Sequence, residues 1–483
     1  MSLPSTAPAE TRLTETTPAE TTGPATPAIP PAVKRLSWTL LIGMVPVTLD
    51  STITNIALHT LSVDLGVALS TIQWVTTAYL LAMAVAVPVT GWLERRFSAK
   101  VVWIAALAGF LVGSIGSATA WNAGSLIAWR AVQGLAAGVV IPLMTTVLMR
   151  AAGKNSLGRL MALLGLPALV IPMLGPVLGG LILNGASWRW MFWINVPLCL
   201  AAMAMAARFL TPDQPQTAAK LDGFGLVLAG VGTAAILYGF AQAGGAGHIL
   251  QASVVVPLVV GAGLLAVFVW WSSRKTDHPV IDLHLFRIGS FTAACVTIVL
   301  VGFSLNSGAM IMPLFLQQVH GSTVLAAGFI IVAQGLGSLA TRGFVGVLTD
   351  RIGARWVVVV CTLVAAAATV PFAFMGAATP WWVICLWLFV RGAGLAGLLI
   401  PAMSVAFLDV PKAQTASSTI ITRTLQQVGG AFGVAVAAVS IAWMASRTSL
   451  AGAYQVAFWI VIGFTVMTGL SAFGLPGRRP TKR

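Results

Sequence analysis

Residues 134–144 read GLAAGVVIPLM and residues 394–403 read GLAGLLIPAM, so a repeat is visible within this single chain. Each copy follows an arginine, Arg130 or Arg391, that is embedded in a long apolar segment. An internal repeat of this kind predicts that the chain consists of two similar halves that run in the same direction through the fold.

A second pair of segments supports this division. GWLERRF at 91–97 follows one apolar segment, and GVLTDRIG at 346–353 follows another. The two pairs place the second and fourth apolar segments in correspondence with the tenth and twelfth. Two bundles of six helices with two inserted central helices satisfy that offset.

The composition is that of an all-α integral membrane protein. Of 483 residues, 58% are hydrophobic and 8% are charged, whereas a soluble domain carries about a quarter charged residues. A window of about 19 residues finds fourteen segments long enough to cross a ~30 Å hydrocarbon core. They are 36–58, 70–92, 100–120, 124–148, 157–183, 190–210, 222–242, 251–272, 290–317, 322–347, 355–376, 380–406, 416–443 and 452–475.

Lysine and arginine collect on alternate loops, as the positive-inside rule requires. The loops on one side of the membrane hold only Arg189 and Arg447. The other basic loop residues lie on the opposite side, together with both ends of the membrane domain. Both termini are therefore expected in the cytoplasm. The formal net charge of +15 follows from this bias, so we expect the partner surface to be the lipid bilayer and not a nucleic acid.

These observations predict five regions, with a disordered cytoplasmic tail rich in Pro, Thr and Ala at the start. The regions are the tail at 1–33, an N-terminal six-helix bundle at 34–210, two inserted transmembrane helices at 211–275, a C-terminal six-helix bundle at 276–475 and a basic cytoplasmic tail at 476–483.

Neither metal nor cofactor chemistry is indicated. Cys199, Cys295, Cys361 and Cys385 fall within predicted spans without metal-ligand spacing, and the histidines lie in or near loops without partner acids. The sequence has no Gly-rich phosphate loop ending in Lys-Ser or Lys-Thr. We therefore expect no enzyme activity, no metal and no cofactor.

Several motifs together resemble the major facilitator superfamily and, within it, the fourteen-helix drug:proton antiporters. The resemblance covers nearly the whole chain after residue 34. The segments that carry it are LDSTITNIAL at 49–58, QWVTTAY at 73–79, RAVQG at 130–134, PMLGPVLGG at 172–180, WRWMFWINVP at 188–197 and QQVGGAFG at 426–433.

Asp50 is the one acid that lies deep inside a predicted span. A charge at that depth costs at least ~2.5 kcal/mol, so such residues usually serve a function. Burial favours the neutral acid and a nearby cation favours the carboxylate. The resemblance implies that Asp50 couples proton movement, and we expect Arg130 to tune it. The alternative is a permanent Asp50–Arg130 ion pair that locks two helices together.

Polar or aromatic side chains inside the spans are candidates for substrate binding, although such residues also join helices by hydrogen bonds. Arg391 has no matching acid in its own half, so it either lines the substrate path or snorkels toward the interface. The predicted substrate-binding residues are Thr54, Asn55, Gln73, Tyr79, Asn306, Gln317, Gln318 and Arg391.

A further set of residues is expected to control the conformational change. The family's loop motif usually has Asp where this chain has Arg95 and Gly where it has Ser98, so Glu94 is the available acid in the first half. The second-half motif is intact, and small residues with two prolines permit a helix to pack closely and bend. The predicted gating residues are Glu94, Arg95, Asp350, Arg351, Gly353, Pro172, Gly175, Pro176, Gly179 and Gly180.

The predicted function is export of small amphipathic, drug-like or antibiotic molecules in exchange for protons, by alternating access across the bacterial cytoplasmic membrane. The proton gradient would drive the cycle without a cofactor, and we expect a monomer. With one embedded acid among several arginines, doubly charged cations should be poor substrates. The alternatives are proton-coupled uptake and a transport-inactive membrane sensor with the same fold.

Overall fold

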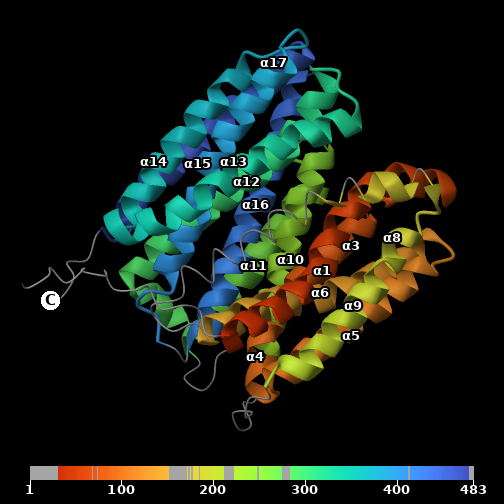
Figure 1. The fold of residues 1–483 in the computed structure, drawn as a ribbon, viewed down its shortest axis with the longest axis vertical. Coiled ribbons are helices and arrows are strands. Elements are labelled where there is room, and N and C mark those ends of the chain that lie inside the picture. Colours follow the sequence, from red (N-terminus) through yellow and green to blue (C-terminus); the bar gives the residue numbers. More distant parts are fainter. Residues whose placement is uncertain are drawn as a thin grey trace, which may run out of the picture.

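A computed structural model gives the arrangement of most of the chain (Figure 1). It describes residues 31–67, 69–72, 74–151, 171, 174–175, 178–183, 185–211, 222–246, 250–274, 283–411, 414–445 and 447–477. Within these ranges every regular element is a helix. The predicted tails at 1–33 and 476–483 lie almost entirely outside the described residues.

The N-terminal half consists of long helices with short connections. A serine cap begins α5, because the Ser98 hydroxyl accepts a hydrogen bond from the Val101 amide. The helices are α1 (Pro31–Asp64), α2 (Leu69–Ile72), α3 (Trp74–Ala86), α4 (Val89–Arg96), α5 (Ala99–Ala118), α6 (Ala123–Ala151), α8 (Trp190–Trp193) and α9 (Asn195–Phe209).

The C-terminal half repeats this pattern, and two helices precede it. The inserted pair is α10 (Gly223–Ala246) and α11 (Ala252–Arg274). The second half contains η1 (Leu283–Arg287), α12 (Gly289–Gln318), α13 (Val324–Ile352), α14 (Ala354–Thr369), η2 (Val370–Ala373), α15 (Trp381–Ala406), α16 (Thr415–Ala445), α17 (Leu450–Ser471) and η4 (Ala472–Gly474).

Among the described residues, twelve helices are long and apolar enough to cross a membrane. They coincide with twelve of the fourteen predicted spans. The predicted span at 70–92 is divided into α3 and α4 by a turn at Val87 and Pro88, so its apolar helix is shorter. The predicted span at 157–183 lies mostly outside the described residues, so the count of fourteen stays a prediction.

The inserted helix α10 lies between the two halves and contacts both, while α11 packs against α10 (Figure 1). On one side the ring of Tyr238 in α10 lies 5.5 Å from the ring of Trp74 in α3. On the other side the ring of Phe240 lies 5.3 Å from that of Phe432 in α16. The halves also meet directly where α16 packs against α4 and α6.

Glycines allow α6 and α15 to pack closely against their neighbours. At Gly134 in α6 a Cβ atom would collide with the Tyr79 carbonyl oxygen of α3, and at Gly392 in α15 it would collide with the Gln334 carbonyl oxygen of α13. Backbones that approach this closely gain packing contacts that larger residues would prevent. Each half therefore has a close glycine contact between its second and fourth predicted spans, although Gly392 precedes the repeated segment at 394–403.

We expect Gly134→Ala to separate α3 from α6 and to lower stability by about 1–3 kcal/mol, as overpacking does. The matched control is Gly343→Ala in α13, because nothing lies within 4 Å of a Cβ at that position. Thermal unfolding of both purified variants in detergent compares them with the parent. Equal melting temperatures for the two variants would contradict the packing role of Gly134.

Candidate functional site

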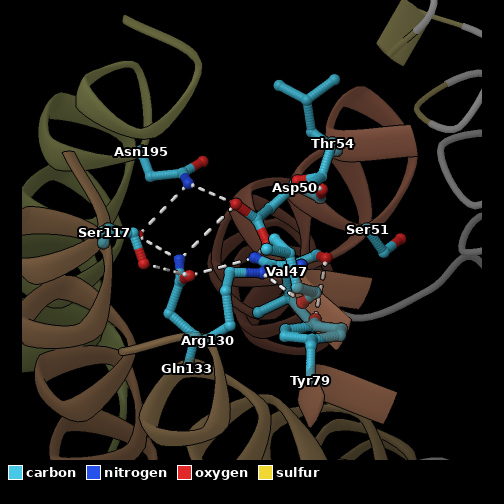
Figure 2. Close-up of polar contacts among 12 residues, drawn as sticks. Val47, Asp50, Ser51, Thr54, Tyr79, Ser117, Arg130, Gln133 and Asn195 are labelled. Atoms are coloured by element: carbon cyan, nitrogen blue, oxygen red, sulfur yellow. Dashed lines mark hydrogen bonds and ion pairs between the residues drawn. The ribbon is translucent and has the colours of Figure 1, made fainter. Parts of the chain in front are cut away.

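A cluster of buried polar side chains surrounds Asp50 in the middle of the N-terminal half (Figure 2). Asp50 on α1 and Arg130 on α6 are both 0% exposed, and Arg130 Nη1 donates to Asp50 Oδ2 in an ion pair. A buried ion pair repays its desolvation only when further hydrogen bonds satisfy the remaining atoms. The residues around Asp50 supply such bonds.

Two amides bind the other oxygen of the Asp50 carboxylate. Asn195 Nδ2 on α9 donates to Oδ1 at 3.0 Å, and Gln133 Nε2 on α6 does so at 3.5 Å. The hydroxyl of Ser114 on α5 accepts from both amides, at 3.2 Å from Asn195 and 2.6 Å from Gln133. The hydroxyl of Ser117 donates to Gln133 Oε1 at 3.1 Å. The network therefore joins α1, α5, α6 and α9.

Arg130 also reaches α3. Its Nε donates to the Val75 carbonyl oxygen at 3.2 Å, and Nη1 donates to Gln133 Oε1 at 3.0 Å. Its Cζ lies 4.3 Å from the ring centroid of Tyr79, a cation–π distance. The Tyr79 hydroxyl in turn donates to the Val47 carbonyl oxygen at 3.4 Å. Arg130 therefore retains favourable contacts other than the carboxylate of Asp50.

Small residues bring the helices close enough for this network. A Cβ at Gly175 would collide with the Thr52 hydroxyl, and one at Gly179 would lie 3.1 Å from the Ile53 side chain. These two glycines of the 172–180 motif thus pack against α1 directly after Asp50. Nothing lies within 4 Å of a Cβ at Gly180, so that residue does not share the contact.

A cavity of about 450 Å³ lies between the two halves. Residues of α3, α6, α10, α12 and α16 form its walls, so both halves and the inserted helix α10 contribute. Its walls are mostly apolar, as is usual for small-molecule sites. The lining residues are Thr77, Leu80, Leu81, Met83, Val87, Ala137, Gly138, Ile141, Pro142, Leu237, Phe240, Ala241, Asn306, Arg423, Gln426, Gln427, Gly430, Ala431 and Val434.

The cavity and the Asp50 cluster share two helices. On α6, Arg130 and Gln133 bind Asp50, and Ala137 begins the part that lines the cavity. Seven residues of helix separate Arg130 from Ala137, or about 10 Å. On α3, Val75 accepts the Arg130 bond and Thr77 lines the cavity. Movement of either helix would therefore affect both sites.

The structure places the predicted substrate-binding residues in different environments. Asn306 lines the cavity. Thr54 is buried and its hydroxyl donates to the Asp50 carbonyl oxygen at 2.9 Å, while Tyr79 belongs to the Asp50 cluster. Gln317 and Gln318 lie in the last turn of α12, away from the cavity lining. The side chain of Asn55 and the whole of Gln73 are outside the described residues.

Arg391 lies inside the C-terminal half, 2% exposed, and it does not line the cavity. Its Nη1 donates to Gln334 Oε1 at 2.6 Å and its Nε donates to the Thr369 hydroxyl at 3.2 Å. Gly308 of α12 packs against its guanidinium. Neutral groups therefore bind Arg391, whereas a carboxylate binds its counterpart Arg130.

The predicted gating residues are partly described. Glu94 on α4 is buried, and its Oε1 lies 2.8 Å from Nη1 of Arg150 at the end of α6. Arg351 is exposed. Gly353 joins α13 to α14 at φ +88°, a conformation that favours glycine. The side chains of Arg95 and Asp350, together with Pro172 and Pro176, lie outside the described residues.

Sequence reasoning did not select several residues of these sites. Gln133 and Asn195 stand inside the RAVQG and WINVP motifs quoted above, and Gln426 and Gln427 begin the QQVGGAFG motif. A polar residue in the same motif as Arg130 is the signal that could have identified Gln133. Ser114 has no such signal, because serine within an apolar helix commonly bonds to its own backbone.

Removing one partner of the buried Asp50–Arg130 pair should cost about 3–5 kcal/mol, because the remaining charge stays buried. We therefore expect Arg130→Gln to be less stable than the double variant Asp50→Asn, Arg130→Gln, which leaves neither charge. Thermal unfolding in detergent of both single variants, the double variant and the parent completes the cycle. Additive effects of the two substitutions would contradict the ion pair.

Comparison with known proteins agrees with this architecture. The model of the Major Facilitator Superfamily matches residues 40–433 and 294–483. The chain is 31% identical over 418 residues to a multidrug resistance protein B homolog of Mycobacterium tuberculosis, covering 86% of this chain and 77% of that protein. It is 28% identical over 388 residues to the lincomycin resistance protein LmrB of Listeria monocytogenes, covering 80% and 82%.

Solved structures share the fold at low sequence identity. A D-xylose-proton symporter superimposes with a TM-score of 0.64 at 13% identity, covering 92% of this chain and 98% of that one. The apolar helices, the repeated halves and these matches lead to one conclusion: the chain is a multi-pass membrane transporter that belongs to the major facilitator superfamily, among relatives named for multidrug resistance.

Proposed function

We propose that this protein exports small amphipathic molecules from the bacterial cytoplasm in exchange for protons, and that Asp50 is the group that takes up and releases the proton. The observation that carries the proposal is the buried carboxylate of Asp50, bound by Arg130, Gln133 and Asn195 on two neighbouring helices. An ionisable group inside a membrane bundle is expensive to maintain and usually serves transport.

Protonation of Asp50 would change the contacts between helices. A neutral acid no longer holds Arg130 by charge, while Arg130 keeps its bonds to the Val75 carbonyl and Gln133 Oε1 and its contact with Tyr79. Protonation would therefore weaken the contact between α1 and α6. The contact between α6 and α3 would remain unchanged. This asymmetry lets one protonation event shift α1 relative to the helices that line the cavity.

The cavity supplies the place for cargo. Apolar side chains such as Leu80 and Phe240 form most of its walls, and the amides of Asn306, Gln426 and Gln427 are at its surface. Asp50 is fully buried and does not line it. Competition between cargo and proton would therefore act through α3 and α6, and not through direct contact of cargo with the carboxylate.

The relatives that are named for multidrug resistance and for lincomycin resistance support the direction of transport. Export driven by protons that move inward gains ~2.3 kcal/mol per proton for each 100 mV of membrane potential, plus the pH gradient. The two halves would rock against each other around the cavity. Both termini in the cytoplasm and a monomeric state complete the proposal.

We expect Asp50→Asn to abolish proton release when substrate is added to the purified protein in weakly buffered detergent, because the amide cannot titrate. Proton-driven accumulation of substrate in inside-out vesicles should fall to the level of vesicles without the protein. A pH indicator and a fluorescent substrate measure the two effects.

The matched control is Asp222→Asn. Asp222 is also buried, but its Oδ1 accepts from the Gly225 amide at the start of α10 and from the Trp271 indole, far from the Asp50 cluster in sequence. This variant should retain proton release and accumulation. Undiminished uphill export by Asp50→Asn would contradict the proposed role of Asp50. Accumulation of substrate in right-side-out vesicles only would favour uptake over export.

A further inference from the structure

Arg423 is the charged side chain among the described residues that line the cavity. It is half-buried on α16, eight residues after that helix begins at Thr415. Gln426 and Gln427 follow on the same helix, and Asn306 of α12 lies in the same wall. The cavity therefore presents one cation beside several amides.

The Arg423 guanidinium has N–H donors that its contacts within the protein do not use. Nη1 donates to Gln426 Oε1 and Nη2 donates to the Thr145 hydroxyl, both at the long distance of 3.4 Å. Among the described residues no Asp or Glu lies within ion-pair distance of it, since the recorded pairs involve Arg130 and Arg150. Arginine carries more N–H donors than these bonds use.

The fifth predicted span cannot supply a counter-charge to Arg423, because residues 152–184 contain neither Asp nor Glu. Arg391 differs from Arg423 in this respect. Its bond to Gln334 is short at 2.6 Å and its side chain is almost completely buried. Of the two arginines, Arg423 is the one that a molecule in the cavity can reach.

The bond from Arg423 to Thr145 also crosses between the halves. Arg423 belongs to α16 of the C-terminal half and Thr145 to α6 of the N-terminal half, near the ends where these helices meet. An occupant of the cavity that draws the guanidinium toward itself would break this bond. Recognition of cargo and contact between the halves therefore depend on the same side chain.

We propose that Arg423 is the specificity-determining residue of the cavity, that it binds a carboxylate or sulfonate group of an amphipathic substrate, and that this binding releases Thr145. The inference rests on the proposed export function. The planar guanidinium matches such oxyanions with paired hydrogen bonds, while Leu80, Leu237 and Phe240 accommodate an apolar body. Anionic amphiphiles are thus bound more tightly than neutral ones of the same shape, and cations less tightly.

Three fluorescent compounds with one aromatic body test the ranking: dansylglycine as the anion, dansylglycinamide as the neutral analogue and dansylcadaverine as the cation. Export is measured in inside-out vesicles, and binding is measured by fluorescence in detergent. In Arg423→Gln, binding and export of dansylglycine should fall by about tenfold to hundredfold, the loss typical of one charged hydrogen-bonded contact. Those of dansylglycinamide should change little.

Arg423→Lys keeps the charge and should restore part of the preference for the anion. This partial recovery would show that the losses in Arg423→Gln do not come from a general failure to fold. Thr145→Val is the second variant, since it removes the partner across the halves and should leave the anion preference intact. Equal losses for all three compounds in Arg423→Gln, or no preference for dansylglycine in the parent, would overturn the inference. Absence of proton-driven export of every compound by the parent would instead count against the proposed function.

Discussion

The rest of the structure depends on how a carboxylate is kept inside a membrane domain. Asp50 is bound by a guanidinium on one oxygen and by two amides on the other, so the cost of its burial is offset by contacts from several helices. The packing around it follows from that need. Gly175 and Gly179 bring the fifth span against α1, and the serine at 114 connects the two amides.

The Asp50 cluster and the cavity are separate in space and joined by helices. Both α3 and α6 pass from one to the other within about two turns. A proton and a cargo molecule can therefore influence each other without touching. The two halves also differ in their chemistry although their sequences repeat, because the described contacts of Arg391 in the second half are with Gly308, Gln334 and Thr369, which are neutral.

Much of this organisation could be predicted from the sequence. Hydropathy predicted the long helices, the repeat predicted the division into halves, and the isolated acid in the first span identified the centre of the buried cluster. Which polar side chains line the cavity could not be predicted, because periodicity does not say which face of a buried helix meets a neighbour. Tyr79 and Arg391 were expected in the substrate path and are enclosed within the halves, whereas Gln426 and Gln427 line the cavity.

The position of α10 has a consequence for how molecules reach the cavity. This helix stands between α3 and α16 and contributes Leu237, Phe240 and Ala241 to the wall (Figure 1). A twelve-helix arrangement without the insertion would leave that flank facing lipid. Here Leu237, Phe240 and Ala241 close that flank, so a molecule must reach the cavity from another side, and the two edges of the transporter are no longer equivalent.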